Sequence, residues 1–180
     1  MSRIPTIEPH AANVEQAALF NAIEAKLGGV PNFLKVLANS PAALKAFLGL
    51  YLIAEEGDLD PQTRERIALS VAELNACEYC VSAHTAIGRK AGLTHAEIET
   101  NRSGSSQDAK AAVAVSLARS LVKNMGELPT QELIYAREAG YSNAELVEII
   151  THVGLNIITN LIGKASRVEI DFPKVALLPA

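Results

Sequence analysis

The sequence is poor in aromatic residues and contains no tryptophan. Phenylalanine and tyrosine together make up 4% of its 180 residues, whereas hydrophobic residues make up 49%. A core without large rings must be built from Leu, Ile, Val and Ala side chains, and the smaller of these bury little area each. Alanine, which is abundant here, is the best helix former. We therefore expect an all-α protein whose copies bury further apolar surface against one another.

Clustered positive charge and long apolar runs are also missing. The formal net charge is −4 and the basic residues are scattered, which gives no indication of a nucleic-acid partner. Residues 1–6 lack the apolar core of a secretory signal. The apolar stretch 153–162 is interrupted by Asn156, Thr159 and Asn160, which disfavours a membrane span. The composition predicts a cytoplasmic protein with neither a nucleic-acid nor a membrane partner.

Helix-start signals recur along the chain. A cap residue followed by Pro occurs at Ser40-Pro41 and at Asp60-Pro61, and Pro31 suits the first turn of a short helix. No segment alternates apolar and polar residues for long enough to predict a strand. We expect a single domain, 1–180, with about eight helices. An extended arm at 1–12 precedes them, and a loop near 101–106 separates the two helical halves.

Two segments, 91–98 and 139–146, resemble each other. Each has a glycine that ends one helix and, two residues later, a Thr or Ser with a Glu three residues further on. Thr94 with Glu97 and Ser142 with Glu145 therefore both predict a capping box at the start of a helix. The likeness does not extend into the flanking helices, so we interpret it as one solution for stopping and restarting a helix, used twice.

Two cysteines and a histidine fall at helical spacing. Cys77 and Cys80 are three residues apart and His84 follows four residues later, so a helix that begins near Cys77 places all three on one face. Cys77 would lie at the positive end of that helix, which lowers a thiol pKa. Cys80 could form a disulfide with Cys77, and His84 could take the Cys80 proton. In a reducing compartment this pattern predicts redox chemistry.

Two other interpretations of the same residues remain open. Cys77, Cys80 and His84 could bind zinc with Glu73 as a fourth ligand, or the cysteines could be purely structural. Structural zinc sites normally pair two such cysteines with a second pair of ligands elsewhere. The chain has no further cysteine, and its other histidines form no pair at ligand spacing: His10, His95 and His152. We expect no metal and no cofactor.

The segment 64–84 with its Cys-x-x-Cys-x-x-x-His motif, followed by 91–93 and 96–98, closely resembles the core of the alkylhydroperoxidase D / carboxymuconolactone decarboxylase family. The resemblance covers about residues 45–125, and 150–156 resembles the peroxidase-related branch. It implies an all-α homo-oligomer, a dimer, trimer or hexamer. It also implies a hydroperoxide substrate and a dithiol reductant such as a lipoyl or thioredoxin-like protein.

The resemblance also assigns roles to individual residues. It implies that Cys80 is the peroxidatic thiol and that Cys77 is the more accessible resolving thiol, which meets the reductant. It implies a proton relay through His84 and Glu65, the residue twelve positions before the first cysteine. From the residues alone, Glu73 competes with Glu65 for the supporting carboxylate, because it lies one turn before Cys77.

One position departs from the best-known family pattern. Tyr79 lies between the two cysteines where alkylhydroperoxidase D often has His. A phenol with a pKa near 10 is a poor base at neutral pH, although it can still donate a hydrogen bond. Tyr79 therefore joins the candidate site residues. It also motivates an alternative function, a non-enzymatic helical oligomer that uses the cysteine pair only to sense redox state or to contact a partner.

Overall fold

The structure, a computed structural model, describes residues 2–179. Within them the chain forms nine α-helices and one short 3-10 helix, and no strand. The all-α prediction is confirmed, with one helix more than the expected eight. The bounds are Pro9–Ala11 for the 3-10 helix, α1 Val14–Leu27, α2 Asn32–Leu37, α3 Pro41–Ala54, α4 Pro61–Leu74, α5 Glu78–Lys90, α6 His95–Ser103, α7 Ala109–Lys123, α8 Thr130–Glu138 and α9 Asn143–Ser166.

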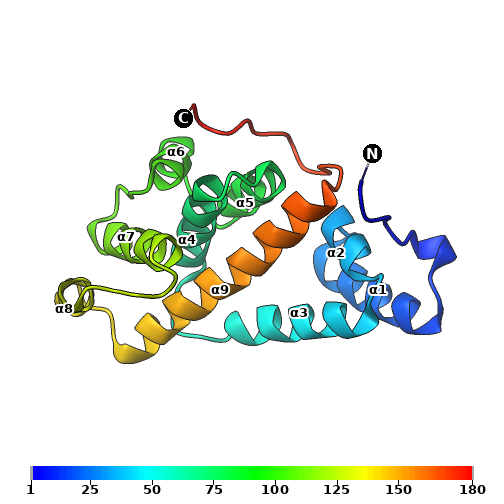
Figure 1. Cartoon of the computed structure of the whole chain (residues 1–180), viewed down its shortest axis with the longest axis horizontal. Coiled ribbons are helices and arrows are strands. Elements are labelled where there is room, and N and C mark those ends of the chain that lie inside the picture. Colours follow the sequence, from blue (N-terminus) through cyan, green and yellow to red (C-terminus); the bar gives the residue numbers. More distant parts are fainter. Residues whose placement is uncertain (1, 180) are drawn as a thin grey trace.

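Two helices organise the packing. The long α9 crosses the centre of the molecule, with α4 to α7 on one side and α1 to α3 on the other (Figure 1). Helix α4 packs against α5, α6, α7 and α9. One apolar cluster joins α1 to α3 with the start of α5, and a second joins α4 with α7, α8 and α9. The start of α5 therefore lies where the α1–α3 lobe meets the rest of the fold.

The predicted helix starts agree with local hydrogen bonds. Ser40 and Asp60 each accept a bond from the backbone N–H three residues on, and the Pro that follows each is the first residue of its helix. Asn13 caps α1 and forms a capping box with Gln16. These signals are local, because a cap and the N–H that it satisfies lie within one turn.

Two predictions around α6 are wrong. The loop expected at 101–106 begins later, because α6 continues to Ser103 and ends at Gly104 with φ 97°. The Thr94 hydroxyl does accept a bond from the Glu97 N–H, but the Glu97 carboxylate does not return it. That carboxylate instead accepts bonds from Arg66 at 2.7 Å and from the amide of Asn101 at 2.9 Å. The Glu97 carboxylate therefore bonds to side chains of the surrounding fold and not to the Thr94 N–H that a capping box would use.

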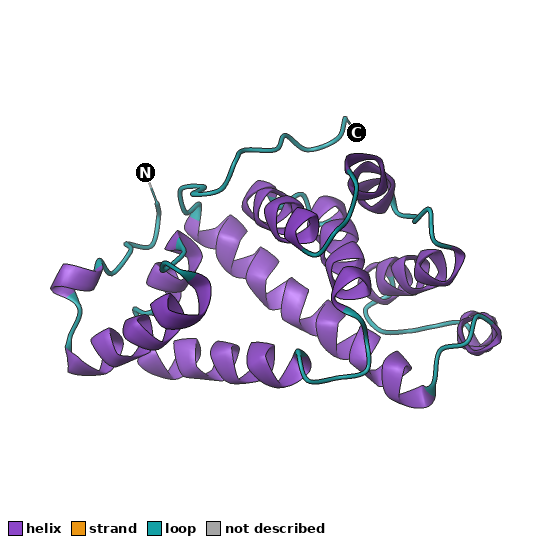
Figure 2. Ribbon diagram, turned by 180° about the vertical axis from the view of Figure 1, so that it is seen from behind, coloured by secondary structure: helices purple, strands orange, loops and turns teal. Residues whose placement is uncertain are grey.

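The expected arm at 1–12 is extended apart from the 3-10 turn at 9–11. A second extended segment, residues 168–179, follows α9, and we call it the C-terminal strap. It runs back over α5 towards α6 (Figures 1 and 2). The N–H of Val175 donates to the Ser82 hydroxyl at 3.0 Å, and the N–H of Leu178 donates to Glu73 at 2.7 Å. The strap thus fastens the chain end to α4 and α5.

Helix α9 is long and apolar enough, by length and composition alone, to cross a membrane. The core helix of a globular domain passes the same test. Here α9 contacts α2, α3, α4, α5 and α7 and buries His152, Asn156 and Asn160. These polar side chains are buried against neighbouring helices, so α9 is the core helix of this domain.

Candidate thiol site between α4, α5 and α9

A tight turn between α4 and α5 positions the first cysteine. The N–H of Cys77 donates to the Ala72 carbonyl at 2.9 Å, and Ala76 adopts a left-handed backbone with φ 50°. A non-glycine residue pays roughly 1–2 kcal/mol for that conformation. The turn reverses the chain, so Cys77 faces the end of α9 instead of extending α4.

Cys77 is the N-cap of α5, as the sequence predicts. Its sulfur accepts a bond from the N–H of Cys80 at 3.4 Å, and the two cysteines form a disulfide. The Cys77 sulfur therefore lies against the positive end of α5, where unpaired backbone N–H groups favour a thiolate. The prediction that Cys77 and Cys80 can form a disulfide is confirmed.

The predicted difference in accessibility between the two sulfurs is wrong. Cys77 is 1% exposed and Cys80 is 3% exposed, so Cys77 is not the more accessible of the two. Gly163 of α9 packs directly over them: a Cβ at this glycine would lie 3.2 Å from the Cys77 sulfur and 3.7 Å from that of Cys80. The N-terminal end of a helix is usually open to solvent, but here another helix covers it.

Glu65 and His84 form the carboxylate–imidazole pair next to the thiols. Glu65 Oε2 lies 2.9 Å from His84 Nδ1, and both side chains are largely buried. When Nδ1–H donates to the carboxylate, Nε2 is left as the proton acceptor. His84 lies one turn after Cys80 on α5. The structure thus pairs Glu65 with His84 and Cys77 with Cys80, and the spacing of four residues places His84 and Cys80 on one face of α5.

Glu73, the competing carboxylate, lies elsewhere. It accepts a bond from Arg102 at 2.7 Å and holds the strap through the N–H of Leu178. The structure therefore pairs the imidazole with Glu65 and gives Glu73 a structural contact. Among residues 2–179, no group of three or more His, Cys, Asp or Glu side chains is placed to hold a metal ion.

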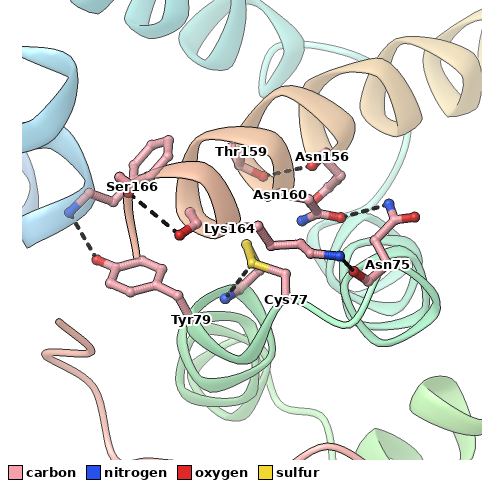
Figure 3. The surroundings of a disulfide bond; sticks show 11 residues. Asn75, Cys77, Tyr79, Asn156, Thr159, Asn160, Lys164 and Ser166 are labelled. Carbon is pink, nitrogen blue, oxygen red and sulfur yellow. Dashed lines mark hydrogen bonds between the residues drawn. A yellow bond between two sulfur atoms is a disulfide. The ribbon is translucent and has the colours of Figure 1, made fainter. Parts of the chain in front are cut away.

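Tyr79 points away from the sulfurs. Its hydroxyl accepts from the N–H of Phe33 at 3.2 Å on the side away from Cys77 (Figure 3). It also donates to Asp171 of the strap at 2.8 Å. Burial, followed by the bond to Asp171, raises the pKa of this phenol well above its usual value. The structure does not bring the Tyr79 hydroxyl to the thiol pair. Its hydroxyl links α5, α2 and the strap.

Sequence reasoning missed the contribution of α9 to the site. Asn160 accepts a bond from the Asn75 amide at 2.8 Å, and the Lys164 ammonium donates to the Asn75 carbonyl at 2.6 Å (Figure 3). Both lie on the face of α9 that turns towards Cys77. A signal was present, because Asn156 and Asn160 interrupt an apolar stretch at a spacing of four residues. Polar residues spaced by one turn lie on one helix face.

A second histidine is buried close to this region. His152 on α9 is 6% exposed, and its Nε2 has no hydrogen-bond partner. Burial first, and then the positive charge of Arg64, lower the pKa of this imidazole. His152 is therefore an interior residue with one ring nitrogen that has no partner.

Comparison with known proteins agrees with this geometry. The family model described as "Carboxymuconolactone decarboxylase family" matches residues 41–123, which include α3, α4, α5 and the thiol site. Solved structures share the fold over almost the whole chain. Residues 41–123 belong to the carboxymuconolactone decarboxylase family, and the whole chain shares its fold with solved peroxidase-related proteins.

Three solved structures share the fold of this chain at low sequence identity. A peroxidase-related protein from Silicibacter sp. TM1040 is 26% identical with a TM-score of 0.81, covering 93% of this chain and 89% of that one. An alkylhydroperoxidase AhpD core protein from Ralstonia eutropha JMP134 is 22% identical with a TM-score of 0.86, covering 94% and 92%. The debrominase Bmp8, in complex with 2,3,4-tribromopyrrole, is 16% identical with a TM-score of 0.80, covering 95% and 92%.

These family relationships define the activity only at a coarse level. The family and the Silicibacter protein point to a peroxidase-related or oxidoreductase-like enzyme. The same fold also carries a debrominase, so the fold by itself does not define the reaction.

Proposed function

We propose that this protein is a thiol peroxidase that reduces organic hydroperoxides through Cys77 and Cys80. The observation that carries the proposal is the disulfide at the N-terminus of α5 with a hydrogen-bonded Glu65–His84 pair one turn further on. A redox-active pair, a general base and a carboxylate that orients the base are the groups that this chemistry needs.

The proposed cycle balances in three steps. His84 takes the Cys80 proton, and the thiolate attacks the terminal peroxide oxygen. The O–O bond breaks, the alkoxide leaves as an alcohol with the proton from His84, and Cys80 becomes a sulfenic acid. Cys77 then attacks the Cys80 sulfur, which releases water and forms the disulfide. A dithiol donor, either a lipoyl or a thioredoxin-like protein in the cytoplasm, supplies two electrons to restore both thiols.

The two cysteines have different expected phenotypes. Reduced wild-type protein supplied with a dithiol should consume an organic hydroperoxide over many turnovers. Cys80→Ser should lose the reaction with peroxide, whereas Cys77→Ser should react once and stop at the sulfenic acid. Peroxide consumption and sulfenic acid trapping measure the two steps. Full activity in Cys80→Ser would refute the mechanism.

The relay is tested by the pH profile of the peroxide reaction in a Cys77→Ser background. His84→Ala should slow the reaction by about 10²–10⁴ near neutral pH. Glu65→Gln should give a smaller defect in the same direction, because Glu65 orients the imidazole and does not take the proton first. Both defects should shrink at high pH, where Cys80 ionises unaided. Superimposable profiles would exclude a relay through these two residues.

Burial of both sulfurs favours one alternative, a redox sensor. A disulfide that is 1–3% exposed is hard for a protein reductant to reach, and a sensor needs only one oxidation. Titration of thiols consumed by one equivalent of peroxide, compared with steady-state turnover, separates the two functions. A sensor would consume its thiols with one equivalent of peroxide but would show no steady-state turnover with a lipoyl, thioredoxin or glutathione donor.

We also propose that the protein works as a homo-oligomer. Large apolar side chains are exposed along α9 and at the end of α3: Ile53 is 70% exposed, Leu161 64% and Val147 62%. Val147 and Leu161 are fourteen residues apart, close to a whole number of helical turns, so they share a face of α9. Such a stripe is what burial against another copy would use.

A further inference from the structure

An unpaired amide lies beside the disulfide. Asn160 is 2% exposed, and its Oδ1 accepts the bond from Asn75, but its Nδ2 has no partner. A buried donor left without an acceptor destabilises the folded state, because it has given up its hydrogen bonds to water. Such groups are rare in folded proteins and call for an explanation in each case.

The position of the amide is defined from two sides. Asn160 lies three residues before Gly163, the residue that packs on the Cys77 sulfur, so both occupy one face of α9. Asn75, which holds the Asn160 oxygen, is two residues before Cys77. Because the oxygen points to Asn75, the nitrogen is left on the side of Cys77 (Figure 3).

The chemistry of the pair supplies the missing acceptor. A disulfide sulfur carries no charge and is a weak acceptor, but a thiolate at the same position carries a full negative charge and accepts strongly. We propose that the Asn160 side-chain N–H donates to the Cys77 thiolate in the reduced protein and thereby stabilises the dithiol state over the disulfide. The inference rests on the proposed redox cycling of the pair, and it adds a residue of α9 to the thiol site.

Other charged groups near the cysteine pair also influence the pKa of the Cys77 thiol. Lys164 on α9 bonds the Asn75 carbonyl, the Glu65–His84 pair lies one turn along α5, and Asp171 reaches the Tyr79 hydroxyl from the strap.

A substitution at position 160 changes none of these charged groups, but Asn160→Leu also removes the acceptor of the Asn75 amide. Asn160→Asp keeps an acceptor for Asn75, so a Cys77 pKa that rises in both variants reports loss of the Nδ2 donor and not loss of the bond to Asn75.

The first measurement is the Cys77 thiol pKa from ultraviolet thiolate absorbance, in a Cys80→Ser background that isolates this sulfur. Asn160→Leu removes the donor at similar volume and should raise the pKa by about one unit, a tenfold loss of thiolate worth about 1.4 kcal/mol. Asn160→Asp replaces the donor by a carboxylate of the same shape, so it should raise the pKa further.

The second measurement uses the intact cysteine pair, equilibrated with reduced and oxidised glutathione. Asn160→Leu should favour the disulfide about tenfold more than wild type does above the thiol pKa, which corresponds to a reduction potential about 30 mV lower. The difference should vanish at pH values below the thiol pKa, because no thiolate then exists to accept the bond.

Asn156→Leu is the matched control. Asn156 is buried on the same helix one turn earlier, but its amide already donates to the His152 carbonyl at 2.8 Å. It should lower thermal stability without changing the Cys77 pKa. An unchanged pKa in Asn160→Leu, or an equal shift in Asn156→Leu, would overturn the inference. Neither measurement uses peroxide, so absence of peroxidase activity would count against the proposed function and leave this result unaffected.

Discussion

Replacing Tyr79 by Phe is expected to speed chemical reduction of the disulfide. The substitution removes only the hydroxyl, which donates to Asp171 and accepts from the N–H of Phe33. The ring contacts with Phe33 and Phe172, at centroid distances of 6.1 and 5.8 Å, would remain. The hydroxyl therefore supplies one of two hydrogen bonds between α5 and the C-terminal strap, and the other joins Ser82 to the N–H of Val175.

The strap matters because, apart from the exposed Glu78, the start of α5 is buried. Residues 79–83 span more than one turn, and all of them are buried. Since α4 and α9 cover two sides, the strap contact at Ser82 closes a third. A reductant can reach the sulfurs only after part of this cover moves. The strap lacks the internal hydrogen bonds of a helix, so we expect it to open before α4 or α9 does.

The size of the effect follows from the bond that is lost. A hydrogen bond to a charged group contributes about 1.5–3 kcal/mol, and each 1.36 kcal/mol changes an equilibrium tenfold. Loss of the Tyr79–Asp171 bond should therefore raise the open fraction of the strap roughly 10- to 150-fold. While opening and closing remain faster than reduction, the reduction rate should rise by the same factor.

The assay follows the free thiols that appear when a small phosphine reductant is added under native conditions. Tyr135→Phe is the matched control, because Tyr135 is 55% exposed on α8, away from the site. Opening of the strap should show a weak dependence on urea, since little surface is exposed. Equal reduction rates in Tyr79→Phe and wild type would refute the gating role. A reduction rate that rises in Tyr79→Phe with the urea dependence of global unfolding would refute it as well.

Three further predictions concern packing, pH and assembly. Gly163→Ala should lower the free energy of unfolding by about 1–3 kcal/mol in urea titrations, because the new Cβ would crowd the Cys77 sulfur. Gly154→Ala is the control: a Cβ at this position has no atom within 4 Å, so the substitution should raise the free energy of unfolding by about 0.5–1 kcal/mol. Hydrogen bonds to Glu97 outweigh burial and lower its pKa from 4.5 to about 2. Stability worth about 3 kcal/mol is therefore present above pH 5 and lost towards pH 2, and Glu97→Gln should flatten that loss in unfolding curves. Sedimentation should show an oligomer that Leu161→Asp dissociates, and a monomeric wild type would contradict the apolar interface.

The parts of the fold that could be read from the sequence are those fixed within one helical turn. The cap at Asp60 and the helix start at Cys77 each depend on neighbours three residues away, so the order and starts of the helices could be predicted. The ability of Cys77 and Cys80 to form a disulfide could be predicted for the same reason, because the two residues are three positions apart. The pairing of His84 with Glu65 was predicted from the family resemblance, because the two residues lie nineteen positions apart and the turn between α4 and α5 has no direction that the sequence predicts.

The rest depended on contacts between distant segments. Asn160 meets Asn75 across 85 residues, and Tyr79 meets Asp171 across 92. No local pattern encodes which face of α9 lies on the sulfurs, so both the burial of Cys77 and the role of the strap were missed. The accessibility of a helix N-terminus is a property of what packs against it and not of the helix itself.

The two similar segments, 91–98 and 139–146, carry the same capping-box pattern, but the capping box is complete in only one of them. At Ser142 the capping box closes, because the Ser142 N–H donates to the Glu145 carboxylate at 2.7 Å. Glu97 has the same local option, but Arg66 on α4 lies within reach at 2.7 Å and Glu97 is 4% exposed. A buried carboxylate gains more from a charged partner than from a backbone N–H that can find water. The local motif therefore governs the helix end only where the surrounding fold offers its carboxylate nothing stronger.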